Sequence, residues 1–427
     1  MITNNSTLNV SEYYRIRDSD QVEDLKKLYL NGSGWSKYLS IEGSTAHFRH
    51  YVGTVQTKNF RFSILPKIWT GDEAEANKNL MRLLLYTYKT PSLFEPEVSI
   101  SPKYENNDLF ELLILFYSMT LEKQLNQGMY RRYVKRDEES RYLRGKLNLQ
   151  RQLNRYDRSL FDITDFRFSA DNEMNRHFAH ATSIFSTYTR DIRSLDLLSS
   201  IETLFKSEGV QGQMLSSPLS FNRLNDRFQI PYNYADLILK HLNPEPGNEK
   251  QSMMMLFDMN IVFQEFFVRF IKRNKSTIFP GKFVKISPQY KRKNFIFNES
   301  GALRFTIPDL KIECRSGDVT KTFILDLKYK LMNSVKIENS PESSEDDIYG
   351  ISSSDLYQMF TYSDLYDSDD TILIFPGSKN DISDPYKFKE TGHKLWICML
   401  HLDFNNDGWE KTLAVKFQTF FNRIGPS

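Results

Sequence analysis

The segment that most constrains how this chain can fold is residues 303–330, which read LRFTIPDLKIECRSGDVTKTFILDLKYK. Two apolar stretches flank the tetrapeptide RSGD at 315–318, and each has the length and composition of a strand. The Ser-Gly centre of the tetrapeptide is typical of a tight turn between antiparallel strands. We therefore predict a β-hairpin whose turn is centred on Ser316 and Gly317.

That register places three polar side chains on one face of the hairpin. Asp309 lies opposite Ile324, and Asp326 and Lys328 follow Ile324 at intervals of two residues, so their side chains project to the same side. Asp309 and Asp326 then become diagonal neighbours, roughly 7–8 Å apart at the backbone. Carboxylates set among apolar neighbours in this way are costly to bury without a cation between them.

These residue types indicate a divalent-cation site. Mg²⁺ prefers oxygen ligands, commonly one or two carboxylates together with water and substrate phosphate. Bound Mg²⁺ polarises a phosphate and acidifies its bound water, while a lysine beside it can orient that water or stabilise the developing negative charge. The hairpin therefore predicts a metal-dependent nuclease site with Asp309 and Asp326 as metal ligands and Lys328 as a catalytic residue. The alternative is an ordinary surface strand, because Asp-x-Lys triplets arise often by chance.

A basic stretch precedes the hairpin. Residues 269–293 contain nine Lys or Arg residues and no acidic residue. Such a stretch can neutralise the phosphates of nucleic acid, although a solvated loop face gives the same composition. The candidate DNA-binding residues are Lys272, Arg273, Lys275, Lys291, Arg292 and Lys293.

Hydrophobic patterning divides the 427 residues into three regions, in keeping with the two or three domains expected for this length. Residues 47–69 alternate between apolar and polar positions, which predicts a hairpin within a β-rich domain over 1–105. Apolar residues then recur at helical spacing, so 106–250 are expected to be mainly helical. The segment HLNPEPGNEKQS at 241–252 marks the next boundary, and 251–427 contain the candidate site.

Capping residues and apolar periodicity predict the remaining helices and strands. Together these elements predict an α+β multidomain protein. A capping box, Asp108-x-x-Glu111, begins the first long helix of the middle region. A strongly apolar helix is expected over 254–272, and another helix from Asp355, after a polar, acidic insert at 331–354. In the C-terminal region these helices flank a mixed sheet whose strands are expected at 283–287, 303–314, 319–330, 371–376 and 395–403.

Charge balance and cysteine usage exclude several classes of protein. The chain has 56 Lys and Arg against 54 Asp and Glu, so any surface that binds nucleic acid must be local. Cys314 and Cys398 belong to no Cys-x-x-Cys pair and are expected as free core residues in a reducing cytoplasm. No G-x-x-x-x-G-K-[ST] phosphate loop occurs, so this chain is not expected to hydrolyse nucleotides. The sequence contains neither a signal peptide nor an apolar run of the roughly 20 residues that span a bilayer, which indicates a cytoplasmic protein without membrane contact.

The spacing Pro308-Asp309 … Asp326-x-Lys328 resembles the PD-(D/E)XK nuclease signature, which many restriction endonucleases share. Its wider context resembles the McrC family, the nuclease subunit of McrBC-type modification-dependent restriction systems. Five stretches that match in order span most of the chain: YVGTVQTKNFRFSILPKI (51–68), YLRGKLNLQRQL (142–153), DNEMNRHF (171–178), DMNIVFQEFF (258–267), and the hairpin followed by DLYQMFTY (355–362).

The resemblance adds two positions to the candidate site. Gln358 matches the glutamine of the family's YQM-type motif, which can orient a phosphate or a water. Many relatives carry a glutamate at the position of Gln264, and here Glu265 next to it is the candidate for a third acidic metal ligand. For the hairpin, the resemblance implies the roles already derived, with Mg²⁺ as the cofactor and Mn²⁺ able to substitute.

The resemblance also implies partners. McrC proteins work with a hexameric AAA+ GTPase of the McrB type, so GTP is expected to act only through that partner. The N-terminal part contacts the ring in this family, which makes Arg61 and Lys67 candidates for the contact, although plain strand positions fit them as well. Arg141, Arg144, Lys146 and Arg151 are candidates for a contact with the partner or with DNA. The expected substrate is double-stranded DNA, in which any methylated site is recognised by the partner.

Three functions remain open at this point. The first is a DNA endonuclease subunit driven by its partner GTPase. The second is an adaptor that activates the partner and no longer cleaves, against which the intact Asp, Asp and Lys argue. The third is a DNA-processing nuclease on the same core, against which the N-terminal matches argue.

Overall fold

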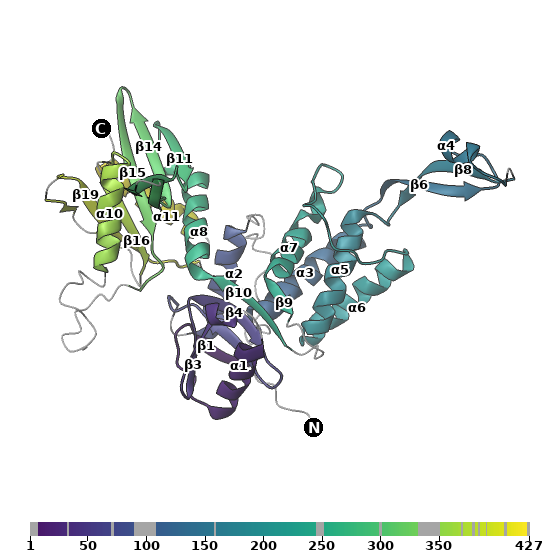
Figure 1. Ribbon diagram of the computed structural model, residues 1–427, viewed down its shortest axis with the longest axis horizontal. Coiled ribbons are helices and arrows are strands. Elements are labelled where there is room, and N and C mark those ends of the chain that lie inside the picture. Colours follow the sequence, from purple (N-terminus) through teal and green to yellow (C-terminus); the bar gives the residue numbers. More distant parts are fainter. Residues whose placement is uncertain are drawn as a thin grey trace.

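The computed structural model shows a mixed α+β protein with several sheets, extended along one axis (Figure 1). Both predicted domain boundaries, 105/106 and 250/251, fall outside the described residues, and so does most of the acidic insert at 331–354. The residues that the structure describes are 7–31, 34–69, 72–88, 108–157, 159–244, 252–298, 301–331, 351–368, 370–377, 381–382, 385–389, 391–404 and 408–424.

A five-stranded sheet organises the N-terminal region. Its order is β1 (Thr7–Ser11), β5 (Arg61–Leu65), β4 (Tyr51–Gln56), β10 (Met253–Asp258) and β9 (Leu242–Pro244). The strands β4 and β5 form the antiparallel hairpin predicted within 47–69, and β1 runs parallel to β5. Around this sheet lie α1 (Ser19–Asn31), a 3-10 turn (Trp35–Lys37), β2 (Leu39–Glu42), β3 (Thr45–Phe48) and α2 (Glu73–Thr87).

The segment predicted as one helix over 254–272 is instead a strand followed by a helix. Its first residues form β10, which pairs along its whole length with β4, and α8 (Met259–Arg273) begins directly after it. The side chain of Asp258 caps α8 by accepting from the Asn260 amide over 3.0 Å. The periodicity of a short apolar run does not distinguish a buried strand from a helix. Here the pairing with β4 makes residues 253–258 a strand. The start of the expected C-terminal domain therefore belongs to the N-terminal sheet.

One glycine makes this pairing possible. Gly53 in β4 has φ +132°, and a Cβ at this position would lie 2.1 Å from the carbonyl oxygen of Met255 in β10. Any other residue would push the two strands apart, so the sequence YVGTV carries the signal for close contact. The path from β4 to α8 is therefore fixed by backbone contact.

Helices dominate the middle region, as expected. They are α3 (Leu109–Asn126), α5 (Glu173–Tyr188), α6 (Ile192–Ser207), a 3-10 turn (Asp226–Phe228) and α7 (Gln229–His241). Asp108 caps α3 as predicted, accepting from the Glu111 amide over 3.1 Å. Aromatic and aliphatic side chains on these helices continue into the core around α2 and α8, so one apolar core joins the middle and C-terminal regions.

The middle region also contains an arm that helical periodicity did not predict. It consists of β6 (Arg132–Ser140), β7 (Lys146–Leu147), α4 (Leu149–Leu153) and β8 (Phe161–Ser169), and it projects away from the helices (Figure 1). The strands β6 and β8 pair over their full length. Most side chains of β6 are exposed and none is buried, whereas β8 buries Ile163 and Thr164. Because β6 buries neither face, its sequence lacks the alternation that reveals a strand.

A seven-stranded mixed sheet forms the C-terminal region. Its path is β11 (Phe283–Pro288), β14 (Leu310–Ser316), β15 (Val319–Leu327), β16 (Asp370–Pro376), β19 (Lys394–Leu400) and β17 (Asp381–Ile382), with β18 (Tyr386–Lys387) also on β19. The first three strands are antiparallel, whereas β15, β16 and β19 are parallel. A separate ribbon of β12 (Lys293–Asn298) and β13 (Gly301–Thr306) lies beside it, and α9 (Lys275–Ile278) follows α8.

Helices cover both faces of this sheet. On one face Ile324 packs in a cluster with Met359 and Tyr362 of α10 (Ser353–Leu365). On the other, Phe323 stacks edge-on against Phe421 of α11 (Trp409–Ile424), at 5.4 Å between ring centroids. Cys314 and Cys398 are buried within β14 and β19 and are not joined in a disulfide, as expected. Within the described part of the chain, no helix is both long and apolar enough to cross a bilayer.

The central hairpin has a register shifted by two residues from the prediction. Leu310 pairs with Leu325 and Ser316 with Val319, so the turn is Gly317-Asp318, with Gly317 in the left-handed region at φ +57°. Continuing that register brings Asp309 level with Asp326 rather than with Ile324. The predicted strand over 303–314 is interrupted at 307–309, between β13 and β14.

Candidate metal centre at the end of the central hairpin

Asp326 and Lys328 stand where β15 ends. Asp326 is 2% exposed and faces the α10 side of the sheet, since it follows Ile324 by two residues. Lys328 lies just past the strand, and its backbone amide donates to the carbonyl of Ile374 in β16 over 2.9 Å. The parallel pairing with β16 therefore extends as far as the lysine.

Asp309 is held by three separate elements. Its Oδ2 accepts from the backbone amide of Leu327 over 2.8 Å, and its Oδ1 accepts from the side-chain amide of Gln264 in α8 over 2.6 Å. Its own carbonyl accepts from the amide of Gln289 over 3.0 Å. Asp309 is thus fixed beside the end of β15 before any ligand binds.

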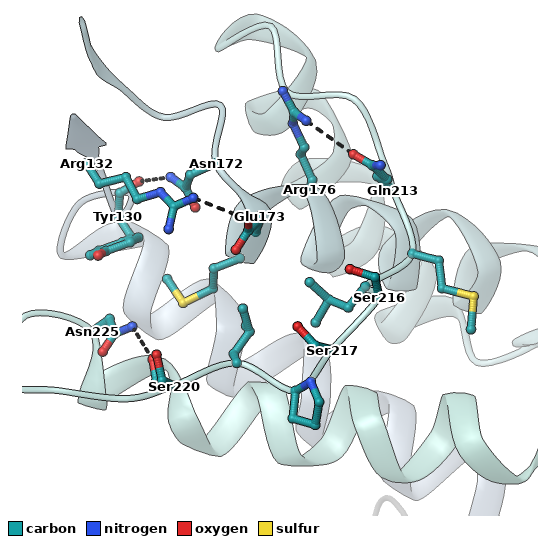
Figure 2. A pocket seen from close by; sticks show the side chains of 15 residues that line it. Tyr130, Arg132, Asn172, Glu173, Arg176, Gln213, Ser216, Ser217, Ser220 and Asn225 are labelled. Atoms are coloured by element: carbon teal, nitrogen blue, oxygen red, sulfur yellow. Dashed lines mark hydrogen bonds and ion pairs between the residues drawn. The ribbon is translucent and has the colours of Figure 1, made fainter. Parts of the chain in front are cut away.

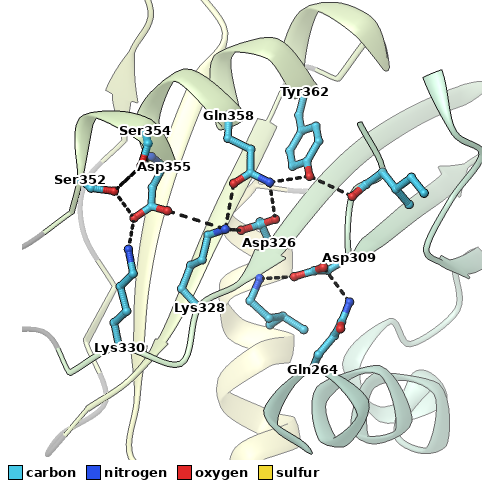
Figure 3. A network of polar contacts seen from close by, with 12 residues as sticks. Gln264, Asp309, Asp326, Lys328, Lys330, Ser352, Ser354, Asp355, Gln358 and Tyr362 are labelled. Carbon is cyan, nitrogen blue, oxygen red and sulfur yellow. Dashed lines mark hydrogen bonds and ion pairs between the residues drawn. The ribbon is translucent and has the colours of Figure 1, made fainter. Parts of the chain in front are cut away.

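Lys328, Asp326 and Gln358 form a polar triangle (Figure 3). The Nζ of Lys328 lies 2.8 Å from Oδ2 of Asp326 and donates to Oε1 of Gln358, also over 2.8 Å. The amide nitrogen of Gln358 is 3.4 Å from Oδ1 of Asp326. The structure therefore brings together the four residues predicted as catalytic, with Asp309 on the neighbouring side.

Three further residues complete this network and were not predicted. Tyr362, one helical turn after Gln358, accepts from the Gln358 amide over 2.7 Å and donates to the carbonyl of Ile307 over 2.9 Å. Asp355, at the start of α10, pairs with Lys330 over 2.7 Å. The spacing of three and four residues between positions 355, 358 and 362 was the available signal, because it places them on one helical face.

Two desolvated carboxylates dominate the electrostatics. Burial, together with the charge of Asp326, raises the pKa of Asp309 to about 7. Burial also raises the pKa of Asp326, against the opposing charge of Lys328. The Oδ2 of Asp326 is buried and has no hydrogen bond within the described residues beyond its ion pair with Lys328. A divalent cation fits this donor set, because it satisfies the open oxygen and offsets both charges.

Comparison with known protein families identifies the chain. Residues 46–376, well over half its length, match the family described as McrBC 5-methylcytosine restriction system component. The chain belongs to this McrBC component family. A comparison with curated proteins finds no match.

A solved structure shows the same fold. This McrBC component resembles a chain of the refined half-complex from the tetradecameric assembly of Thermococcus gammatolerans McrB AAA+ hexamers with bound McrC. The TM-score is 0.66 at 21% sequence identity, over 98% of this chain and 100% of that chain. The cryo-EM structure of the T. gammatolerans McrBC complex contains a further match, with TM-score 0.47 and 22% identity over 63% of this chain and 88% of that chain.

Glu265 of this McrBC component does not lie at the candidate centre. Its side chain is 46% exposed and faces Arg269 one turn along α8, at 3.9 Å. Neighbouring helical positions differ by about 100° in direction, and Gln264 takes the inward one. The prediction of Glu265 as a metal ligand is therefore corrected: an amide, not a carboxylate, faces Asp309. Within the described part of the chain, no three His, Cys, Asp or Glu side chains gather in a metal-binding cluster.

The predicted DNA-binding residues separate into two groups. Lys291, Arg292 and Lys293 follow Gln289, whose amide binds the Asp309 carbonyl, so they adjoin the candidate centre. Lys272 and Arg273 end α8 and Lys275 begins α9, where its ammonium is 5.9 Å from the ring of Phe283. Phe283 begins β11 and Pro288 ends it, so the two groups are separated by about 17 Å along that strand.

Arg61 and Lys67 differ in their exposure to a partner. Arg61 is 1% exposed, and its guanidinium binds Asp108 over 2.6 Å and Glu111 over 2.8 Å. It therefore joins β5 to the start of α3 inside the protein. The ammonium of Lys67 lies 4.7 Å from the ring centroid of Tyr329, which places it against the segment that follows Lys328. The burial of Arg61 corrects the expectation that it contacts a partner, whereas Lys67 is half-buried and its contact with a partner stays a prediction.

A second hollow lies at the base of the arm. It has a volume of about 410 Å³ and lies between β6, the start of α5 and the loop at 213–220 (Figure 2). Arg132 faces Glu173 over 3.5 Å, and Arg176 pairs with Asp171 over 2.5 Å. Because both arginines are already paired with carboxylates, we assign no anionic ligand to this hollow.

Proposed function

We propose that this chain is the DNA-cleaving subunit of a McrBC-like restriction complex, hydrolysing phosphodiester bonds of double-stranded DNA with Mg²⁺. The observation that carries the proposal is the convergence of Asp309, Asp326 and Lys328 at one end of the central hairpin. Burying two neighbouring carboxylates costs free energy, so it is not expected on an ordinary surface strand, yet Asp326 is only 2% exposed. Membership of the McrBC component family supports the same reaction.

The residues divide the chemistry between them. Asp309 and Asp326 would hold the cation, and Mg²⁺ or Mn²⁺ bound there would supply charge stabilisation and an acidified water. Lys328 carries a positive charge. Burial alone would lower its pKa, but the charges of Asp326 and Asp355 outweigh burial, so its pKa lies above the ordinary value. Its Nζ can therefore donate to a phosphate oxygen or orient the attacking water. Gln358 holds that Nζ from the helix side over 2.8 Å.

DNA would approach over the group that adjoins the centre. Lys291, Arg292 and Lys293 are exposed, and the guanidinium of Arg292 lies 3.5 Å from the ring centroid of Phe305. Contacts between such basic side chains and the phosphate backbone of DNA position a duplex without reading its sequence. We therefore assign to the partner the recognition of sequence or methylation.

The partner we propose is a hexameric AAA+ GTPase of the McrB type. The related T. gammatolerans structure is described as McrB AAA+ hexamers with bound McrC. The present sequence has no G-x-x-x-x-G-K-[ST] loop, so GTP hydrolysis would belong to the partner. The GTPase and the nuclease would then reside on different chains of one complex.

We place the partner contact on the arm rather than on Arg61. The arm projects from the helices and carries exposed large apolar side chains, whereas several of its charged residues are paired with one another (Figure 1). Exposed apolar groups on a projecting element are typical of a protein-binding surface. These side chains are Tyr133, Tyr142, Leu143, Leu149, Leu153, Tyr156, Phe166 and Phe168.

Reconstitution with the partner GTPase tests the function. With GTP, Mg²⁺ and 5-methylcytosine-containing plasmid, the wild-type complex should cut, whereas Asp309→Ala and Asp326→Ala should abolish cutting and retain stimulation of the GTPase. A variant that still cuts at the wild-type rate would overturn the site assignment. A wild-type complex that stimulates GTP hydrolysis but leaves DNA intact would instead identify the chain as a non-cleaving adaptor.

A further inference from the structure

Three consecutive residues after β15 contact two opposite sides of the molecule. Lys328 contacts Asp326 and Gln358 in the candidate centre, and Lys330 pairs with Asp355 at the start of α10. Tyr329, between them, points to the opposite side and reaches the N-terminal region. The backbone amide of Lys328 still pairs with β16, whereas Tyr329 and Lys330 lie beyond that pairing, so side-chain contacts contribute much of what holds these two residues in place.

Tyr329 is buried between the N-terminal and C-terminal regions. It is 4% exposed, and its ring lies 5.9 Å from that of Phe263 in α8 and 4.7 Å from the ammonium of Lys67. Its hydroxyl donates to Oε1 of Glu12, which follows β1 directly and is 317 positions away in sequence. A tyrosine adjacent to the candidate catalytic lysine is thus bonded to the N-terminal sheet.

Glu12 is a fixed acceptor for this bond. It is 4% exposed, its backbone amide donates to the carbonyl of Leu65, and its Oε1 also accepts from the Lys67 amide, both over 3.0 Å. The next residue, Tyr13, has φ +64°, a left-handed conformation that a bulky residue adopts only where its surroundings enforce it. Burial also raises the pKa of Glu12 against the opposing charge of Lys67, so the carboxylate sits in a site with little water.

We propose that Glu12 and Tyr329 are positioning residues for the nuclease centre, which fix the end of β15 and thereby the Nζ of Lys328. The proposal rests on the proposed function, since it assigns a role toward Lys328. Tyr329 is the middle residue of a tight turn in which the Lys330 amide donates to the Lys328 carbonyl over 2.9 Å, so anchoring the Tyr329 ring fixes the backbone that carries Lys328. The hydrogen bond between Tyr329 and Glu12 also makes the geometry of the centre depend on the position of the N-terminal sheet.

Point substitutions at the two bonded residues test this role in the full-length chain assembled with its McrB-type GTPase. Tyr329→Phe removes only the hydroxyl, and Glu12→Ala removes the acceptor. Each should lower kcat for plasmid cutting by about ten- to a hundredfold with little change in KM, because misplacement of a catalytic group by an ångström has that effect. Glu12→Gln keeps an oxygen that accepts from the tyrosine and should restore cutting to near the wild-type rate.

Tyr117→Phe is the matched control. Tyr117 is fully buried in α3, and its hydroxyl bonds the Phe178 carbonyl and the Thr182 hydroxyl over 3.0 Å, remote in sequence from the centre. It loses a comparable buried bond, so its melting temperature should fall while kcat of the folded protein stays unchanged. Equal losses of kcat in Tyr117→Phe and Tyr329→Phe would overturn the positioning role.

Hydrogen–deuterium exchange separates this proposal from the proposed nuclease function. In the chain alone, exchange within residues 326–331 should rise in Tyr329→Phe and Glu12→Ala, but not in Glu12→Gln or Tyr117→Phe. This measurement needs no DNA cutting, so an inactive wild-type complex would overturn the nuclease function and leave the bond's effect on Lys328 measurable. Unchanged exchange, or raised exchange with unchanged kcat in an active complex, overturns the positioning role.

Discussion

The side-chain amide of Gln264 donates to Oδ1 of Asp309 over 2.6 Å, so helix α8 meets the candidate metal centre with a neutral group. A carboxylate at the same position would face Asp309 with its own negative charge. The contact thus leaves Asp309 and Asp326 as the two carboxylates that we propose as metal ligands, with the charge of Lys328 beside them.

Gln264→Glu should therefore bind Mg²⁺ more tightly than the wild type, since affinity rises with the number of charged oxygen ligands. We expect a gain of about tenfold, measured by isothermal titration calorimetry on the DNA-free chain. In metal-free buffer near pH 8 the same variant should melt at a lower temperature, because two adjacent carboxylates repel. Glu265→Gln is the control, and equal effects of the two changes would contradict the assignment of Gln264 to the centre.

Metal binding should depend on pH through Asp309. Burial and the charge of Asp326 raise the pKa of Asp309 to about 7, well above the value near 4 of an unfolded chain. For the metal-free protein this group favours folding below about pH 4, and that contribution is lost as pH rises through 7. A cation needs the ionised form, so Mg²⁺ should raise the melting temperature more at pH 8 than at pH 6. Asp309→Asn should abolish the difference between the two pH values.

Arg61→Ala should unfold readily, which distinguishes a structural role from a partner contact. It would leave Asp108 and Glu111 buried without a counter-charge, a change that lowers the free energy of unfolding by about 3–5 kcal/mol. Neutralising the acids as well, in Arg61→Met with Asp108→Asn and Glu111→Gln, should recover much of that loss in urea titrations. The triple variant should still stimulate the partner GTPase, and loss of stimulation in a well-folded triple variant would restore Arg61 as a partner contact.

DNA affinity should depend on the basic group beside the centre. Replacing Lys291, Arg292 and Lys293 by Gln should weaken duplex binding and reduce the slope of log affinity against log salt by about 2–3, since each phosphate contact contributes about 0.9. Lys272→Gln with Lys275→Gln is the control at the far end, where α8 ends and α9 begins. Fluorescence anisotropy over a salt series measures both, and a larger effect of the control pair would move the DNA path to that end.

Strand parity is the part of the site that sequence could predict. The hairpin register was wrong by two residues, yet Asp309 and Asp326 still meet, because a shift of two preserves the face to which each side chain points. Gln358 was predicted from a motif, and its contact with Lys328 follows from helix α10 packing over that face. Burial of Cys314 and Cys398 was expected because the chain has only two cysteines and they form no Cys-x-x-Cys pair.

Tertiary contacts decided what sequence did not predict. Arg61 occurs in an alternating strand, and only its distant acids Asp108 and Glu111 make burial of the guanidinium possible. Sequence alone did not show whether Gln264 or Glu265 faces the candidate centre. The rotation of α8 about its axis turns Gln264 toward Asp309 and Glu265 away from it. Strand β6 of the arm has little alternation because both of its faces are accessible to solvent.

The pairing of β10 with β4 sets a limit on how this protein can be dissected. A fragment that starts near residue 251 would retain α8 and the candidate metal centre but expose both edges of β10, whose partners β4 and β9 would be missing. Unpaired apolar edges of this kind invite aggregation. Removal of the N-terminal hundred residues would have a similar effect and would also delete Glu12. The boundary at which a biochemist would naturally cut thus runs through a sheet, and point substitutions in the intact chain are the sounder way to assign its parts.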